Sequence, residues 1–258
     1  MSSASTRIER DGYVTLPGVF SPAEVRAMRA AVESALAEGS GDDPAIRGGE
    51  GTVYAARNLL DLWPGLVTAW HRPVLVETLT AVLGRDFGLV RVLYFDKPPG
   101  NSWALPWHKD LTIAVRNNRL PSQRFARPTR KAGVPHVEAP VEVLEGMLTA
   151  RIHLDGVTDE NGPLKVVPGS HRTGKALVLE DAEVRTLHAE AGDVLLVRPL
   201  VAHCSNRSRP DTTLHRRILH LEFAARADLP DGFAWHDFIP GVRSQESGVR
   251  EERPQPPG

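Results

Sequence analysis

Short β-forming segments separated by turns run from Gly88 to Phe223, and no other feature of the sequence constrains the fold as strongly. The segments are rich in β-branched, aliphatic and aromatic residues, as strands are. Turns such as Asn161-Gly162-Pro163 interrupt them. Many short strands joined by turns are typical of a sandwich or a barrel. The strands predicted in this way span residues 89–95, 147–155, 164–167, 194–197 and 217–223.

Helical patterns dominate the first third of the chain. Ser21-Pro22-Ala23-Glu24 combines an N-cap serine, a proline at the first helical position and a capping-box glutamate. Apolar residues recur at helical spacing from there to Gly39, and a second helix is predicted over residues 73–84. We therefore expect three parts. They are residues 1–87, a helical layer of the same domain; residues 88–226, the β core; and residues 227–258, a C-terminal extension whose end is composed like a disordered tail.

Composition limits the compartment and the partners. The single cysteine, Cys204, cannot form an intramolecular disulfide, and the polar start Met1-Ser2-Ser3-Ala4-Ser5 lacks the apolar run of a secretory signal. No segment approaches the roughly twenty apolar residues that span a bilayer, and a formal net charge of −1 argues against a general nucleic-acid binder. We expect a cytoplasmic enzyme with no nucleic-acid or membrane partner, and the sequence does not set its oligomeric state.

His108 and Asp110 are candidate metal ligands, because residues two apart on a strand point to the same side. A histidine from a distant strand, His203, would complete two histidines and one carboxylate, the facial triad of non-haem iron(II) oxygenases. Spacing alone is weak support, since the chain has ten histidines and a second His-x-Asp pair at His153 and Asp155. Ordinary polar roles stay open for either pair.

A longer set of motifs resembles a known family. Residues 161–172, Asn-Gly-Pro-Leu-Lys-Val-Val-Pro-Gly-Ser-His-Arg, lie between an upstream His-x-Asp and a downstream Gly-Asp-Val and His-x-Ser-x-x-Ser. Together with Gly12-Tyr13-Val14 and Lys97-Pro98-Pro99-Gly100, they resemble the phytanoyl-CoA dioxygenase family over residues 11–225. The resemblance implies a double-stranded β-helix (jelly-roll, cupin-like) catalytic core at residues 88–226, with the N-terminal helices packed on one sheet. It also implies Fe(II) as cofactor, with 2-oxoglutarate and O2 as co-substrates.

The resemblance assigns the metal ligands position by position. It makes His108, Asp110 and His203 the catalytic iron ligands, and it places His171 in a loop. Cys204 would point away from the iron if its neighbour His203 points in, so we interpret it as a packed thiol.

The same resemblance implies a co-substrate site. Arginine suits the far carboxylate of 2-oxoglutarate, because its planar fork pairs with both oxygens and stays charged when desolvated. Aligning Phe223 with the aromatic residue that closes the family's final core strand favours Arg216, and Arg217 stays the alternative. Ser205 and Leu93 match family positions near the co-substrate.

Three residues are candidates for substrate contact. Strict alternation puts Thr149, Arg151, His153 and Asp155 on one face of their strand, and a polar face in a barrel would look into the cavity. Arg151 and His153 are therefore candidates, and Trp107, beside the metal pair, is the third. The alternative is a buried hydrogen-bonded network around Asp155. Many relatives resemble one another in having an aromatic residue near Arg151, and this chain departs from them there.

A long basic segment follows the metal pair. Residues 116–131 contain no acidic residue, and a turn-rich stretch extends them toward residue 142. We predict a lid over the barrel mouth rather than a structural strand, drawing in an anionic substrate. The alternative is a solvated basic loop without a partner. The basic residues are Arg116, Arg119, Arg124, Arg127, Arg130 and Lys131.

Together these observations predict an Fe(II)- and 2-oxoglutarate-dependent dioxygenase. The expected reaction is hydroxylation of an unactivated C–H bond of a small-molecule metabolite, with release of succinate and CO2. Desaturation, cyclisation and the identity of the substrate stay open. Two other classes also stay open: a zinc- or nickel-dependent cupin-like hydrolase or isomerase, since two histidines and one carboxylate also suit zinc, and a non-catalytic β-barrel binding protein.

Overall fold

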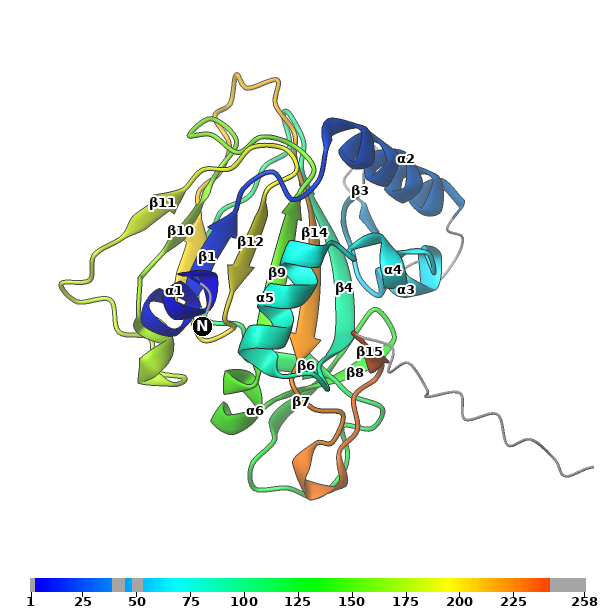
Figure 1. Ribbon diagram of the computed structural model, residues 1–258, viewed down its shortest axis with the longest axis vertical. Helices are drawn as coiled ribbons and strands as arrows, with labels where there is room; N and C mark the ends of the chain where they lie inside the picture. Colours follow the sequence, from blue (N-terminus) through cyan, green and yellow to red (C-terminus); the bar gives the residue numbers. More distant parts are fainter. Residues whose placement is uncertain (1–2, 39–44, 48–52, 242–258) are drawn as a thin grey trace, which may run out of the picture.

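The computed structural model describes residues 3–38, 45–47 and 53–241 (Figure 1). Over these ranges the chain is mainly β with a few helices, and the strands pair in antiparallel fashion. The expectation of a mainly β chain with N-terminal helices is therefore confirmed. The tail predicted to be disordered, residues 251–258, lies outside the described residues.

The largest sheet forms the centre of the molecule. Its longest pairing joins β14 to β4, where Arg216 lies opposite Lys97. The predicted strand at residues 147–155 ends at His153, since the backbone bends at residues 154–155, and the Asp155 carboxylate binds Arg217. In spatial order the strands are β1 (Tyr13–Leu16), β12 (Val194–Val197), β9 (Met147–His153), β14 (Arg216–Ala224), β4 (Gly88–Lys97), β3 (Val53–Ala56) and β2 (Ala45–Arg47), with β15 (Ile239–Pro240) paired to β4.

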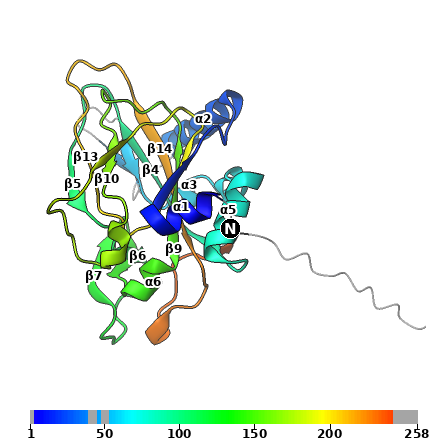
Figure 2. The ribbon, with the colours of Figure 1, turned by 60° about the vertical axis from the view of Figure 1, so that its left-hand side comes forward.

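Two smaller sheets complete the β structure. The second sheet runs β11 (Arg185–Leu187), β10 (Leu164–Val166), β13 (His203–Ser205) and β5 (Leu105–His108). The third runs β6 (Thr112–Ala114), β8 (Val134–Glu138) and β7 (Ala126–Lys131). Figure 2 shows β5, β10 and β13 on one side of the main sheet and helices α2, α3 and α5 on the other. The main sheet therefore has one face toward helices and one toward the second sheet.

The helices pack on the main sheet through apolar side chains. The capping box at the start of α2 forms as predicted, since the Ser21 backbone N–H donates to Glu24 Oε2 (2.7 Å). Val25, Val32 and other residues of α2 and α5 join Leu219, Leu221 and Phe223 of β14 in one buried core. The helices are α1 (Ser3–Asp11), α2 (Pro22–Glu38), α3 (Leu59–Leu62), α4 (Leu66–Ala69), α5 (Pro73–Leu83) and α6 (Val141–Glu145), with short 3-10 turns η1 (Ser170–Thr173) and η2 (Pro230–Gly232).

Two N-terminal features were not predicted. Helix α1 was missed because Ser3–Asp11 is short and polar, and it packs chiefly through Ile8. The first 87 residues also supply β2 and β3 to the main sheet, strands that were not predicted, so this part of the chain is more than a helical layer. None of the helices in the described ranges combines the length and the apolar character that crossing a membrane requires.

The basic segment after the metal pair is partly a hairpin. β7 pairs with β8 through a two-residue loop, Ala132-Gly133, whose φ angles of 44° and 76° are those of a type I′ turn. The prediction of a lid without a structural strand is therefore wrong for Ala126–Lys131. The sequence concealed the turn, because alanine rarely takes its first position.

The charges of that segment are also spread out. Arg124 forms a salt bridge with Asp231 (2.5 Å), and Arg127 lies 3.5 Å from Glu138. Neither side chain lines the cavity described below.

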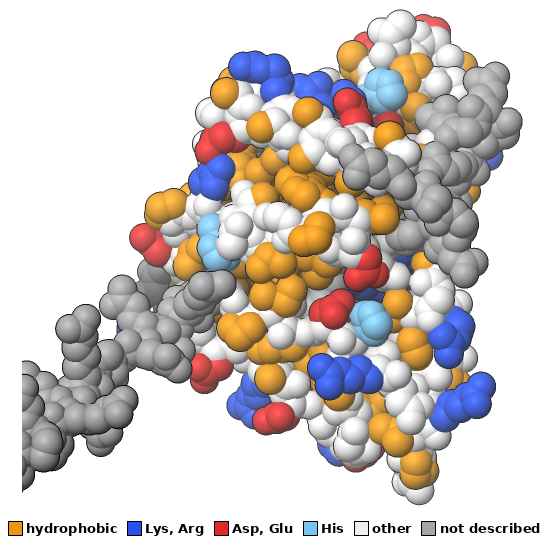
Figure 3. Space-filling model, turned by 90° about the vertical axis from the view of Figure 1, so that its right-hand side faces the viewer, with side chains coloured by type: hydrophobic (Ala, Val, Ile, Leu, Met, Phe, Trp, Pro, Cys, Tyr) orange, Lys and Arg blue, Asp and Glu red, His pale blue; other side chains and the backbone are white. Residues whose placement is uncertain are grey.

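On the side of the molecule in Figure 3, charges of both signs are interspersed with apolar side chains. This face therefore lacks the single-sign stripe that nucleic-acid binders carry.

Buried histidines are expected to make stability depend on pH. The Nδ1–H of His136 donates to the Val134 carbonyl (3.0 Å), so its Nε2 accepts from Arg91 (2.9 Å). Burial, together with the charges of the neighbouring Arg91 and Lys131, lowers the pKa of His136 to about 4. Between about pH 6.5 and 4, this imidazole is therefore protonated in the unfolded chain, where its pKa is about 6.5, but stays neutral in the folded chain.

Stability should accordingly fall as pH drops from about 6.5 toward 5, by up to about 1.4 kcal/mol per pH unit for this ring. His136→Gln keeps an acceptor for Arg91 but cannot titrate, so its unfolding free energy should fall less steeply over that window. Urea unfolding of both proteins at several pH values measures the difference. Parallel slopes would show that His136 does not carry this effect.

Candidate active site

The pairing of β5 with β13 places two of the predicted metal ligands side by side. His108 and His203 are direct partners across this antiparallel pair, and their ring centroids lie 4.2 Å apart. Asp110 follows the end of β5, and its backbone N–H donates to the Pro199 carbonyl (2.9 Å). Within the described residues, His108, Asp110 and His203 are the one group of His, Cys, Asp or Glu whose potential ligand atoms all lie within 4.8 Å.

Backbone hydrogen bonds orient both histidine rings. Nδ1 of His108 lies 2.7 Å from the Pro106 carbonyl, and Nδ1 of His203 lies 2.9 Å from the Val201 carbonyl. A carbonyl only accepts, so each Nδ1 carries the proton and each Nε2 has a free lone pair. The two Nε2 atoms lie 3.7 and 3.6 Å from different oxygens of Asp110. All three donors therefore face one point.

The protonation states suit metal binding. Burial lowers the pKa of His203 to about 4, so this ring is neutral at physiological pH, as a ligand must be. Burial alone would raise the pKa of Asp110, but His203, His220, His108 and Arg151 together hold it below its ordinary value. Two imidazoles and one carboxylate leave coordination positions open, and this donor set fits ferrous iron.

A cavity of about 270 Å³ opens beside these donors, between the main sheet and the second sheet. Aromatic and aliphatic side chains form part of its wall, and polar side chains from both sheets point into it. The lining residues are Tyr54, Ala55, Arg57, Phe95, Trp103, Leu105, His108, Asp110, Arg151, Leu164, His203, Ser205, Arg216 and His220.

Arg216 lies in this cavity as a buried cation without an acidic partner. Its side chain donates to the Gly162 carbonyl, its Nε has no partner, and no described acidic group forms a salt bridge with it. Burial and the nearby Arg151 lower its pKa to about 9, so it stays charged at neutral pH. An unpaired buried guanidinium is costly unless an anion binds it.

Arg217 points the opposite way. It forms paired hydrogen bonds with the Asp155 carboxylate (2.8 and 2.9 Å) and reaches Glu33 of α2 (3.0 Å). The register of β14 therefore puts Arg216 toward the cavity and Arg217 toward the helices. Asp155 is occupied by Arg217, so it does not organise a network with His153.

Ser205 and Lys97 lie near Arg216. Ser205 lines the cavity and accepts a hydrogen bond from Lys97 Nζ (3.0 Å), which also donates to the Asn206 carbonyl (2.7 Å). Burial lowers the pKa of Lys97 to about 7, and the charges of Arg216 and Arg151 act in the same direction. Leu93 is buried on the same face of β4 as Phe95, opposite His220, but is not a lining residue.

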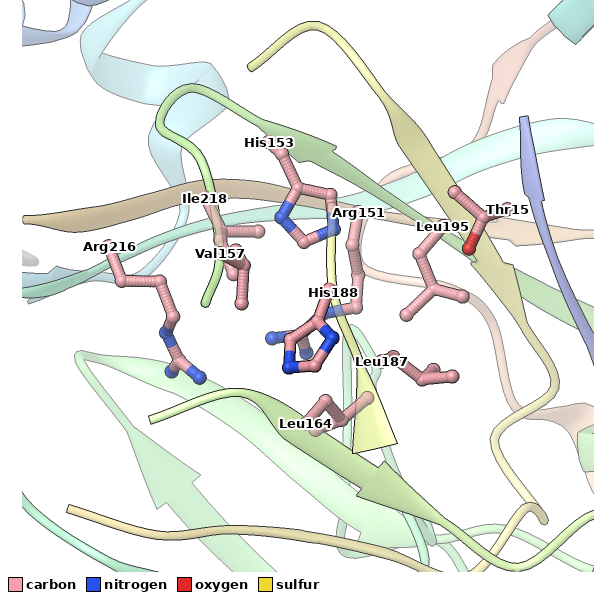
Figure 4. Close-up of a pocket in the computed structure, with 10 residues that line it drawn as sticks. All are labelled: Thr15, Arg151, His153, Val157, Leu164, Leu187, His188, Leu195, Arg216 and Ile218. Atoms are coloured by element: carbon pink, nitrogen blue, oxygen red, sulfur yellow. The ribbon is translucent and has the colours of Figure 1, made fainter. Parts of the chain in front are cut away.

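Of the candidate substrate residues Arg151 and His153, only Arg151 lines the cavity that contains the metal ligands. Arg151 lines the cavity beside the metal ligands and lies 3.3 Å from His220 Nδ1. His153 is buried behind it, in a smaller pocket that Arg151 and Arg216 also line (Figure 4). Burial lowers the pKa of His153 to about 3, and its Nδ1 has no partner.

Trp103 takes the place that was expected for Trp107. Trp107 neighbours His108 on β5 and so points to the other side of the strand, and it is not among the lining residues. Trp103 lines the cavity and packs on Tyr54, with ring centroids 5.3 Å apart. His171 lies in η1, where its Nε2 bonds to the Glu9 carbonyl, away from the ligand group.

Sequence reasoning missed several lining residues. His220 could have been found, since it shares the parity of Arg216 on the predicted strand. Phe95 could also have been found, since it lies two residues from Leu93 on the predicted strand. Arg57 follows a strand that was not predicted, and no periodic pattern marks it.

Comparisons with known proteins identify relatives of this chain. A profile of the phytanoyl-CoA dioxygenase family matches residues 8–217. The L-proline trans-4-hydroxylase of Streptomyces griseoviridis is 30% identical over 178 residues, which are 69% of this chain and 57% of that protein. The match thus spans little more than half of the relative's length.

Two solved structures have a similar fold. AviO1 from Streptomyces viridochromogenes Tue57 matches with a TM-score of 0.60 and 23% identity, covering 88% of this chain and 96% of AviO1. EctD from S. alaskensis, solved with 2-oxoglutarate and 5-hydroxyectoine, matches with a TM-score of 0.66 and 20% identity, covering 87% of this chain and 76% of EctD. At these identities the likeness concerns the fold.

An antiparallel β fold with two histidines and one carboxylate at a cavity defines the class of non-haem iron oxygenases. Since the family profile covers most of the sequence, the chain belongs to the phytanoyl-CoA dioxygenase family.

Proposed function

We propose that this protein is an Fe(II)- and 2-oxoglutarate-dependent dioxygenase that hydroxylates a C–H bond of a small-molecule metabolite. The observation that carries the proposal is a three-donor metal group in one cavity with a buried, unpaired arginine. Iron(II) with 2-oxoglutarate and O2 would supply the oxidising chemistry, ending in succinate and CO2. The S. griseoviridis relative, named as a proline hydroxylase, supports hydroxylation as the outcome.

In this proposal each residue has a distinct task. His108, Asp110 and His203 hold the iron, and the carbonyls of Pro106 and Val201 keep both rings in the binding tautomer. His203 comes from β13, His108 from β5 and Asp110 from the segment after β5, and all three line the cavity, so a metal held by them would be accessible from it.

Arg216 binds the far carboxylate of 2-oxoglutarate in this proposal. The co-substrate would replace the missing acidic partner, and Ser205, held by Lys97, would supply a further polar contact. Apolar side chains such as Phe95 and Leu164 exclude water from the remaining wall. We further propose that the two facing sheets form the double-stranded β-helix of this family, with residues 88–226 as the catalytic core.

The two rival functions explain less of the site. A zinc or nickel hydrolase would use the same three ligands but gives Arg216 no role. A non-catalytic binding protein gives no role to the free lone pairs that the two backbone-oriented histidines direct at Asp110. The dioxygenase accounts for both features.

Conversion of 2-oxoglutarate to succinate tests the proposal. The ferrous protein should form succinate in the presence of O2, and a matched substrate should speed this and appear with one added oxygen atom. Zinc-loaded protein should form no succinate. Ferrous protein that binds 2-oxoglutarate but never converts it, with any compound of a metabolite panel, would contradict the proposed reaction.

A further inference from the structure

The cavity carries more positive charge than the proposed cofactor and co-substrate neutralise. Three arginines and one aspartate line it, and these four side chains carry a net charge of two positive units. A ferrous ion and a 2-oxoglutarate dianion cancel one another. Two positive charges therefore remain in a partly desolvated space, where uncompensated charge is costly.

One of these charges lies at the metal end. Arg151 is buried, which lowers its pKa, and it bonds to the His220 ring, while the charge of the Asp110 carboxylate opposes that shift. The negative charge that acts on Arg151 is thus a metal ligand. Arg216, whose pKa the charge of Arg151 lowers, is matched by the far carboxylate of 2-oxoglutarate in the proposed function.

Arg57 is the remaining cation, and no acidic group among the described residues forms a salt bridge with it. Its side chain is half-buried at the cavity wall, and no hydrogen bond or salt bridge joins it to the described part of the chain. Glu222 is the acidic group that acts on it, but that carboxylate is bound to Arg91 (2.8 Å). Burial and the charge of Arg91 lower the pKa of Arg57, so its environment disfavours the cation it carries.

The hairpin of β7 and β8 adds a second cation on this side. Asn58, the neighbour of Arg57, donates to the Ala132 carbonyl at the hairpin turn (3.2 Å). Lys131, just before that turn, donates to Thr112 Oγ1 (3.0 Å), and Arg57 and Arg91 both lower its pKa. Lys131 therefore lies near Arg57 and adds positive charge beside this part of the cavity wall, although it is not a lining residue itself.

We propose that the primary substrate is a small organic anion whose carboxylate or phosphate group pairs with Arg57, so that the carbon to be oxidised lies at the metal. This inference rests on the proposed dioxygenase function and names its substrate class. A guanidinium fork suits either anion, because it pairs with two oxygens at once. The specificity residue is Arg57, not the exposed arginines of the basic segment.

The size of the cavity restricts the substrate further. Its volume of about 270 Å³ is below the 300–1,000 Å³ of common ligand sites, and 2-oxoglutarate occupies part of it. The part of the substrate that enters must therefore be small, about the size of an amino acid or a short hydroxy acid.

Matched pairs of compounds test the proposal. The anaerobic ferrous protein, saturated with 2-oxoglutarate, is titrated with small carboxylic acids and their amides, and with phosphate monoesters and their parent alcohols. Binding is followed by the change in the charge-transfer absorption of the iron. We expect acids or phosphate esters to bind at least about tenfold more tightly than their neutral partners, and the series that binds identifies the anion. Binders are then assayed for succinate release.

Substitution of Arg57 locates the effect. Arg57→Gln should weaken binding of the anion by about tenfold or more and remove the difference between acid and neutral partner, while Arg57→Lys restores part of it. Arg127→Gln removes the same charge from the exposed hairpin and should leave the affinity unchanged. If Arg57 only supported the fold, its substitution would lower stability without changing the ratio of the affinities for the acid and for its neutral counterpart.

Several outcomes would overturn the inference. They are neutral compounds that bind as tightly as acids, anions that do not bind at all, or an anion whose affinity Arg57→Gln leaves unchanged. Failure of the proposed function is distinguishable, because 2-oxoglutarate alone would then produce no charge-transfer absorption before any substrate is added.

Discussion

His108→Ala and Asp110→Ala are each expected to lose most of the bound iron and essentially all turnover of 2-oxoglutarate. Each substitution leaves two protein ligands, and two ligands cannot hold the labile ferrous ion. The loss should be specific to the site, because both side chains are partly exposed at the cavity and contribute little to the core. Iron content after purification and succinate formation measure the two effects.

His153→Ala is the matched control for these variants. His153 belongs to the second His-x-Asp pair of the sequence, but the structure places it behind Arg151 rather than with the ligand group. This variant should keep its iron. An empty site in His153→Ala together with a loaded site in His108→Ala would mean that the ligand assignment is wrong.

Arg216→Ala is expected to weaken 2-oxoglutarate binding by about 30-fold to several thousand-fold while sparing iron. The estimate follows from the cost of about 2–5 kcal/mol for removing one member of a buried, hydrogen-bonded charge pair. Titration of the anaerobic ferrous variant with 2-oxoglutarate measures the change in affinity, and metal analysis measures the iron.

Arg217→Ala separates the two neighbours on β14. Arg217 binds Asp155 and Glu33, so its loss should reduce stability by about 1–3 kcal/mol and leave the affinity for 2-oxoglutarate nearly unchanged. Exchanged behaviour of the two variants would place the strand register one residue away from the observed one.

Local periodicity made part of this site predictable. A period of two puts His108 and Asp110 on one side of a strand, and the same rule separates Arg216 from Arg217. The long strands and capped helices could be predicted for the same reason, because their patterns are local. His203 lies about 95 residues from the pair by the numbering. Spacing offered it only as a candidate, and the family resemblance assigned its role.

Features set by strand register and by chain reversal could not be predicted. The direct pairing of His203 with His108 depends on how β13 aligns with β5. The β7–β8 hairpin depends on a turn that Ala132 enters with a positive φ. Arg57 reaches the cavity only because β3 joins the edge of β4. The first and the third depend on contacts between segments far apart in the sequence, and the hairpin depends on a turn conformation that alanine rarely adopts, so composition and periodicity predict none of them.

Anaerobic titration of the ferrous protein with 2-oxoglutarate tests the proposed iron and co-substrate site as a whole. Tight binding of 2-oxoglutarate to the iron requires the three metal ligands and Arg216 together. We expect a metal-to-ligand charge-transfer absorption that grows until the co-substrate is equimolar with iron. The band should be absent in Asp110→Ala and should need far more 2-oxoglutarate in Arg216→Ala. Iron-loaded protein that shows no such band, or a band that Asp110→Ala leaves unchanged, would contradict the proposed iron and 2-oxoglutarate site.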